Sequence, residues 1–369
     1  MSEIKVNSIK GVAATTAALT INNTDGTCTA NITNNLSNRN LIINGAMQLA
    51  QRGTSDSGIT QSGYTVADRF KLGGSSFGTV TVSQSTDSPD GFSNSYKVDV
   101  TTANGSLSAG SLLEIQQSLE GQDVQAFAKG TSAAKQYALS FYVKSTKTGT
   151  YVAMLFDHDN NRMVCKTYTV SDTNWNRYTL IFPADTTGAF GNDNEKSLSV
   201  KFALVAGTSF TSGTLQTTWG TSANASSRVG QVNFADSTSN EWYLSGVQLE
   251  VGNVATDFEH RSFADELVRC QRYFQKLDYR RGTGNSGHRH MYKENIPFIV
   301  SMRAAPSLYA SSAYQSDSGD PVTYTAGDYS TTTTGLTLAH ATTNQITVSG
   351  GSGSQYHDIR CRAHLAAEL

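Results

Sequence analysis

The chain has 369 residues, a formal net charge of -2 and only 16% charged residues. This balance argues against an electrostatic nucleic-acid binder, because duplex binding needs concentrated Lys and Arg to neutralise phosphates. Disordered chains pair low hydrophobicity with high net charge, whereas this chain is nearly neutral and has 16 Tyr and 15 Phe to bury. The composition therefore predicts many short strands joined by small-residue turns.

The four cysteines, Cys28, Cys165, Cys270 and Cys361, lie far apart and form no CxxC pair. Neither a metal site nor a disulfide framework is expected, so free thiols are the default and no cofactor is predicted. The N-terminus lacks the apolar core of a signal peptide, and no stretch approaches a membrane span. A protein of this kind that works outside a cell would leave it by another route, such as the release of virions by lysis.

Residues 1–37 are predicted to form a separate segment. Ile4 and Val6 alternate, as do Leu19 and Ile21, but too few large apolar residues are present to close a core. The segment must then pack on copies of itself or on another protein. An interleaved trimeric stalk or a docking segment is the preferred interpretation, and a poorly ordered tail is the alternative.

Residues 38–261 alternate between apolar and polar positions in short runs separated by polar turns. Such runs predict antiparallel sheets that are each buried on one face. The predicted strands include 80–82, 96–100, 137–143, 151–156, 162–170, 175–182, 200–204 and 241–251. About eight to ten strands of this kind predict a jelly-roll-type β-sandwich.

A linker helix is predicted over 262–276, with Ser262 as its N-cap and Asp265 at the third helical position. It leads into a smaller β domain, residues 277–369. The strands predicted in this domain are 296–302, 306–310, 322–325, 336–340, 345–348 and 357–365. A unit of about 90 residues with this little apolar content is marginal alone, so oligomerisation is expected.

Several blocks of the sequence resemble a family of phage tail-fibre proteins, marine phages included. The opening blocks are 38–48 (NRNLIINGAMQ), 51–54 (QRGT) and 64–70 (YTVADRF). The closing blocks are 247–262 (VQLEVGNVATDFEHRS), 270–274 (CQRYF), 302–306 (MRAAP) and 367–369 (AEL). The resemblance covers roughly residues 38–306 and the last few residues. The pattern often has Trp where Phe70 stands here, a departure that keeps an aromatic core residue.

The resemblance implies a carbohydrate-binding-like jelly roll in a homotrimer that serves on a virion. The expected function is a non-enzymatic tail fibre or spike whose distal end contacts a host receptor or glycan. The N-terminal segment would dock on another virion protein. A capsid decoration or head-fibre protein and a freestanding carbohydrate-binding module are the alternatives. A glycan-cleaving tail spike is the enzymatic rival, and it would need an acid cluster that this sequence does not display.

Three polar clusters have alternative interpretations. Asp257 and Glu259, followed by His260-Arg261, indicate either a salt-bridged corner or an acid/base pair, and the corner is favoured. The run 157–161 (DHDNN) indicates a hairpin turn, because a calcium loop of the EF-hand type would need Gly and Glu at fixed later positions. The tripeptide 288–290 (HRH) is an exposed strand or, less favoured, a metal site on a three-fold axis.

The aromatic residues divide into two groups. Trp175, Trp242, Phe141 and Tyr178 lie in alternating strands and are predicted to be core residues. A second group sits among Ser, Thr and Gly, where no core pattern protects the rings, and an exposed ring suits the recognition of a sugar face. The receptor or glycan-contact candidates are Trp219, Tyr309, Tyr314, Tyr324 and Tyr329.

Overall fold

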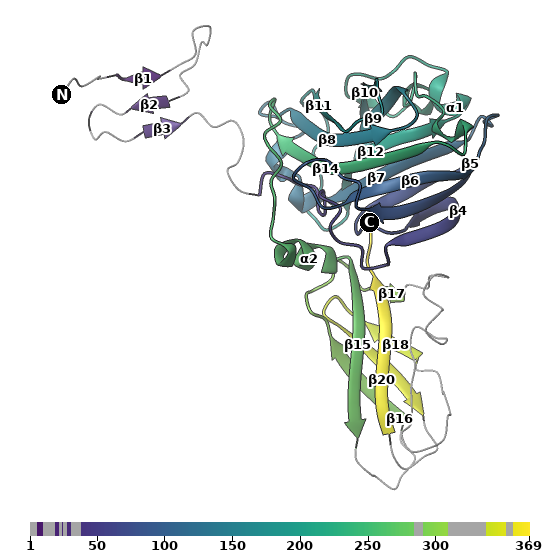
Figure 1. Ribbon diagram of the computed structural model, residues 1–369. Coiled ribbons are helices and arrows are strands. Elements are labelled where there is room, and N and C mark those ends of the chain that lie inside the picture. The colour runs from purple at the N-terminus through teal and green to yellow at the C-terminus, as the bar shows by residue number, and fades with distance from the viewer. Residues whose placement is uncertain are drawn as a thin grey trace.

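The fold is that of a computed structural model (Figure 1), which describes residues 6–9, 19–21, 24, 28–30, 38–283, 291–308, 337–351 and 357–369. Most of these residues lie in antiparallel strands, as predicted. No helix within these ranges is long and apolar enough to cross a membrane.

The N-terminal segment contributes a small antiparallel sheet. It consists of β1 (Ser8–Ile9), β2 (Leu19–Ile21) and β3 (Cys28–Ala30), in the order β1-β2-β3. Val6 and Ile9 are 41% and 52% exposed. None of the residues of this segment whose burial is described is fully buried. The segment therefore shows no core of its own in its described part.

Residues 38–261 form the predicted β-sandwich. Its strands are β4 (Ser55–Tyr64), β5 (Lys71–Ser85), β6 (Ser95–Thr102), β7 (Leu112–Glu120), β8 (Tyr137–Ser145), β9 (Gly149–Asp157), β10 (Arg162–Val170), β11 (Asn176–Phe182), β12 (Lys196–Ala206), β13 (Gly220–Thr221) and β14 (Glu241–Val251). Short helical turns join them: η1 (Gly121–Asp123), η2 (Gln125–Phe127), α1 (Thr208–Thr211), η3 (Asn224–Ser226) and η4 (Phe234–Asp236).

The strand order identifies the jelly roll. One sheet runs β6-β14-β8-β11 and the other runs β7-β12-β9-β10, so that consecutive strands of the chain repeatedly change sheet. The long strand β5 belongs to both sheets, because its first half pairs with β7 and its second half pairs with β6. The strand β4 pairs with β5, and β13 pairs with β10.

One continuous hydrophobic core lies between the two sheets. Phe141, Phe202 and Trp242 are all fully buried in it, and Tyr178 packs against its edge. Three of the four predicted core aromatics are therefore confirmed as part of the core. Trp175 is the exception. It lies two residues before Arg177, so both side chains face outward from β11, and Trp175 is only half-buried.

The linker helix is shorter than predicted. It is α2 (Phe263–Gln271), and Ser262 caps it by accepting a hydrogen bond from the Asp265 N–H at 3.1 Å. The helix ends because Phe274 already pairs with Ala366 in a sheet. Backbone pairing across the chain thus overrides the helical spacing that Phe274 shares with the residues before it.

The described residues of the C-terminal domain form two three-stranded sheets, in the orders β15-β20-β17 and β16-β19-β18. The strands are β15 (Phe274–Thr283), β16 (Met291–Pro297), β17 (Ser307–Leu308), β18 (Thr337–Ala341), β19 (Gln345–Gly351) and β20 (His357–Ala366). The strand predicted at 296–302 lies earlier, at β16. The strand predicted at 322–325 falls outside the described residues. Figure 1 shows this domain as a narrow extension from the base of the sandwich, beside α2.

A buried ion cluster joins the C-terminus to the sandwich. The Glu368 carboxylate accepts hydrogen bonds from Arg52, at 2.8 Å, and from Arg69. The side chains of Arg52 and Arg69 are at most 1% exposed, and that of Glu368 is 8% exposed. Each guanidinium also lies over a ring next to α2: Arg52 is 3.9 Å from the centre of Phe274, and Arg69 is 3.4 Å from that of Tyr273.

A second set of contacts surrounds this cluster. Arg272 and the Tyr273 hydroxyl donate hydrogen bonds to Glu120 at the end of β7, at 2.7 and 2.5 Å. Arg303 donates to the carbonyl oxygens of Ala367 and Asn194, at 2.9 and 3.0 Å. The extension is therefore fixed to the sandwich by charged hydrogen bonds that have little contact with solvent.

We predict that Glu368→Gln lowers the free energy of unfolding by about 3–5 kcal/mol, because it removes the carboxylate that pairs with the buried Arg69 guanidinium and leaves Arg52 with Asp68, 3.5 Å away. Glu195→Gln is the matched control. The side chain of Glu195 is 72% exposed and lies 3.6 Å from Arg303, so its loss should cost about 1 kcal/mol or less. Urea unfolding of both variants gives the comparison, and equal effects of the two substitutions would contradict it.

Candidate functional site

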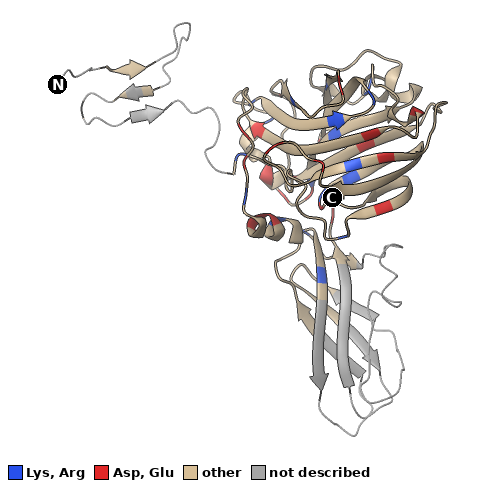
Figure 2. Cartoon of the chain, viewed as in Figure 1, with Lys and Arg blue, Asp and Glu red and all other residues tan. Residues whose placement is uncertain are grey.

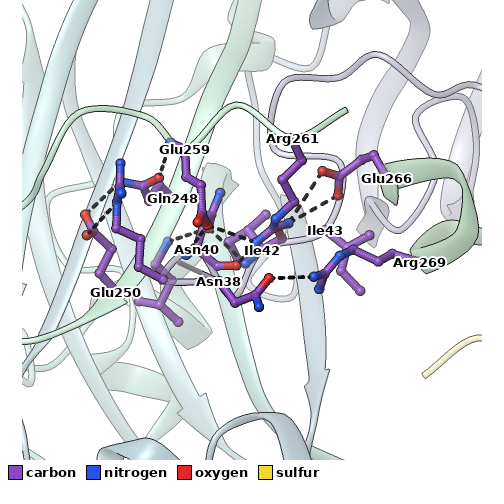
Figure 3. Close-up of polar contacts among 12 residues, drawn as sticks. Asn38, Asn40, Ile42, Ile43, Gln248, Glu250, Glu259, Arg261, Glu266 and Arg269 are labelled. Carbon is purple, nitrogen blue, oxygen red and sulfur yellow. Dashed lines mark hydrogen bonds and ion pairs between the residues drawn. The ribbon is translucent and has the colours of Figure 1, made fainter. Parts of the chain in front are cut away.

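The block around Asp257 and Glu259 forms a salt-bridged corner, as predicted (Figure 3). The Arg261 guanidinium donates to the carbonyl oxygens of Asn40 and Ile42 and lies 3.4 Å from both Glu259 and Glu266. Glu259 also accepts the Asn40 N–H at 2.9 Å. These contacts join the start of the sandwich to the entry of α2, which favours a structural role for Glu259.

The predicted hairpin turn at 157–161 is confirmed, because these residues connect β9 to β10 in register. Asp157, at the start of the turn, is fully buried and pairs with the Lys129 ammonium at 2.6 Å. Lys129 also lies 3.1 Å from the Asp185 carboxylate and donates to the carbonyl oxygens of Thr187 and Gly188. The ammonium of Lys129 thus balances charge on the carboxylates of Asp157 and Asp185 and donates hydrogen bonds to the two carbonyl oxygens.

Across the part of the chain that the structure describes, no group of three or more His, Cys, Asp and Glu side chains is placed to hold a metal ion. His288 and His290 lie outside the described residues. Cys165 and Cys270 are free, as expected, and burial raises the pKa of the Cys165 thiol to about 12. The side chains of Cys28 and Cys361 are not described.

His158 is held in its neutral form. Its Nε2 lies 2.8 Å from the Ser199 hydroxyl. Burial first, and then the positive charges of Lys196 and Lys201, lower its pKa to about 3. Between pH 6.5 and 3 the unfolded chain therefore binds a proton at His158 that the folded chain does not bind. The free energy of unfolding must fall as the pH falls through this window.

We predict that His158→Gln, which keeps a side chain able to bond Ser199, makes the slope of the free energy of unfolding against pH less positive between about pH 6.5 and 4. Asp68 acts in the opposite direction, because burial raises its pKa to about 6. Asp68 is present in both proteins, so its contribution cancels in the difference. Urea unfolding at a series of pH values measures the two slopes, and parallel curves would contradict the prediction.

The five predicted glycan-contact residues have different outcomes. Trp219 is half-buried: its ring centre lies 5.6 Å from that of Tyr137, and its indole N–H donates to the Pro183 carbonyl oxygen at 2.8 Å. The expectation that no core packing protects this ring is corrected, since Trp219 packs against the main core. Tyr309, Tyr314, Tyr324 and Tyr329 lie outside the described residues and stay predictions.

A cluster of rings lies instead on the outer surface of sheet β6-β14-β8-β11, here called the ring face. Phe92 packs on Tyr142 and Phe258, with ring centres 5.4 and 5.0 Å apart, and His260 packs on both phenylalanines. Gly246 lies directly beneath, with φ +61°, and a Cβ there would approach Tyr142 to 2.7 Å and Phe92 to 2.8 Å. Glycine is therefore required where these rings meet the sheet.

A row of paired charges continues the ring face. Tyr243 lies between Lys97 and Lys144 on the neighbouring strands, and Trp175 packs edge-on against it at 6.1 Å. Lys97 pairs with Glu241 at 2.7 Å, and Lys144 pairs with Asp87 at 2.6 Å. Figure 2 shows basic and acidic positions side by side on adjacent strands of the sandwich.

The rings of this face combine apolar surface with polar edges. The Trp175 indole N–H donates to Asp87 at 2.9 Å, and the Tyr243 hydroxyl donates to Glu241 at 2.7 Å. The half-buried Trp175 ring can contact the C–H face of a sugar while the neighbouring charged groups bind its hydroxyls, whereas the Tyr243 ring is buried beneath it. The sequence analysis missed them, although the period-2 alternation of β8 and β14 places Tyr142 and Lys144, like Glu241 and Tyr243, on the outer face.

The chain is similar to several solved structures, although it matches no family model or curated sequence. Among solved structures, it is similar to the enzymatically active domain of bacteriophage CBA120 tailspike protein 4, with 15% identity and a TM-score of 0.31. That match covers 58% of this chain and 21% of the tailspike chain, so this chain spans about a fifth of that structure.

Two further similar structures are a sugar binding protein and a carbohydrate-binding module. One is a putative sugar binding protein from Bacteroides thetaiotaomicron, with 13% identity, a TM-score of 0.30 and coverage of 57% of this chain and 99% of that one. The other is the family 11 carbohydrate-binding module from Clostridium thermocellum, with 11% identity, a TM-score of 0.28 and coverage of 56% and 98%. At these values the likenesses carry no argument about function.

Proposed function

We propose that the protein is a non-enzymatic structural component of a phage virion, a homotrimeric tail fibre or spike that contacts a glycan on the host surface. The observation that carries this proposal is the ring face, an outer sheet surface that presents half-buried aromatic rings beside paired charges. The N-terminal segment also supports the proposal, because Val6 and Ile9 remain exposed, as expected for residues that pack on a partner. That partner is the neighbouring copies or another virion protein.

The two carboxylates that pair with the lysines of the ring face favour binding over cleavage. A glycosidase needs a carboxylic acid that stays protonated near neutral pH, and its pKa is therefore raised. Although burial opposes it, hydrogen bonds from Lys144 and Trp175 lower the pKa of Asp87. The hydrogen bond from Lys97 lowers that of Glu241. Both carboxylates are therefore ionised at neutral pH and paired with lysines.

A trimer would give the binding its strength. A single shallow face on a sandwich binds a sugar weakly, whereas several such faces held together bind far more tightly. Trimerisation would also cover Ile299, which is 65% exposed. The virion is then the proposed location, with assembly in the host cytoplasm and release by lysis.

We predict that Trp175→Ala weakens retention on the best glycan of an array by about tenfold, which corresponds to about 1.4 kcal/mol, because it removes one stacking ring. Phe263→Ala is the matched control: this ring is 58% exposed but lies on α2, away from the ring face. Both variants should keep the melting temperature of the parent protein. Equal retention of the parent and Trp175→Ala would remove the ring face as the contact.

Light scattering on the same samples gives the mass of the free protein. The proposal expects about 118 kDa, three times the chain mass of 39.5 kDa. A mass of one chain would contradict the trimer and favour a freestanding binding module or a capsid decoration protein.

A further inference from the structure

Three lysines lie close together on the opposite sheet of the sandwich. Lys71 on β5 pairs across strands with Gln116 on β7, and Gln116 pairs in turn with Lys201 on β12. Lys196 stands at the start of the same strand β12. The neighbours Leu72 and Val200 point into the core, so Lys71 and Lys201 share the outer face with Gln116. We call this surface the lysine face.

The positive charge of the lysine face is only partly balanced. Lys201 lies 3.2 Å from Glu114, but that carboxylate is already bound by Arg228. Among the described residues, no carboxylate lies within ion-pair distance of Lys71 or Lys196. Glu120, opposite Lys196 in the register, is occupied by Arg272.

The three ammonium groups affect one another and their surroundings. Burial first, and then Lys201 and Lys71, lower the pKa of Lys196. After burial, the charges of Lys196 and Lys201 also lower the pKa of His158, and so help to keep it neutral. An anion placed among these groups would relieve a repulsion that the folded protein otherwise retains.

An aromatic ring lies at the edge of the lysine face. Phe156 is half-buried, its ring centre is 4.6 Å from that of His158, and the Lys201 ammonium is 5.2 Å from it. Ser199 lies between Phe156 and Ser118 in the register. Gly73 on β5 presents no side chain above Glu114 and Gln116. The surface thus combines a ring, an amide and surplus cations on a smooth sheet.

We propose that the lysine face binds an acidic glycan, a chain of sugars that carry carboxylates. The carboxylates would lie between Lys71 on β5 and Lys196 and Lys201 on β12, two strands that are separated by β7, and a sugar ring would stack on Phe156. A nucleic acid fits less well, because three lysines on a chain of net charge -2 offer little phosphate neutralisation. The site goes beyond the proposed function, since it lies on the other sheet and does not involve the ring face.

The test compares a galacturonic acid oligomer with a galactose oligomer of equal length, titrated calorimetrically into the full chain. The wild type should bind the acidic oligomer at least tenfold more tightly, and added salt should weaken that binding. In the double variant Lys71→Gln/Lys196→Gln the affinity should fall at least tenfold. Lys147→Gln, which removes a lysine that pairs with Asp236 and belongs to neither face, should bind as the wild type does.

Three outcomes would overturn the proposal. One is unchanged affinity of the Lys71→Gln/Lys196→Gln variant while its melting temperature matches that of the wild type. Another is equal affinity of the wild type for the two oligomers. The third is tighter binding of a single-stranded oligonucleotide of the same charge through the same two lysines. None of these outcomes alters the expected effect of Trp175→Ala, so failure here is distinguishable from failure of the proposed function.

Discussion

The Glu368 carboxylate, shared by Arg52 and Arg69, is the contact on which the arrangement of the C-terminal half depends. Burying three charged groups is costly unless each has its partners, and the paired geometry meets that requirement. Because both arginines also lie over rings that follow α2, the same contact fixes the helix, the first strand of the extension and the last strand. Under the proposed function, this contact would hold the binding domain rigidly on the extension.

This cluster explains why the sequence blocks with a phage-fibre resemblance are so far apart in the chain. Arg52, Arg69, Tyr273, Arg303 and Glu368 come from five separate blocks, and all of them lie at the base of the sandwich. A second group of residues, which includes Asn40 and Glu266, contacts the guanidinium of Arg261 (Figure 3). These blocks therefore encode how the sandwich is joined to what surrounds it, and they say little about what its outer faces bind.

Much of the fold follows from local pattern, because period-2 alternation directly reflects burial on one side of a sheet. The jelly-roll sandwich and the 157–161 hairpin were predictable for that reason, and the Ser262 cap was predictable because Ser is a favoured N-cap residue. The end of α2 was not, since Phe274 fits both a helix and a strand and only its pairing with Ala366 decides. The ring face was missed because Phe92 and Phe258 come from loops, and their approach to Tyr142 depends on tertiary packing around Gly246.

The two outer faces differ in a way that the composition conceals. On the ring face each lysine has its own carboxylate, whereas on the lysine face Lys71 and Lys196 have none among the described residues. The net charge near zero is therefore the sum over two faces that differ in how far their positive charges are balanced.

The most direct test of the account is electron microscopy of the phage particles labelled with gold-conjugated antibody against the purified protein. Gold on the tail fibres or spikes is the predicted result, and particles that carry no gold at any position would contradict it.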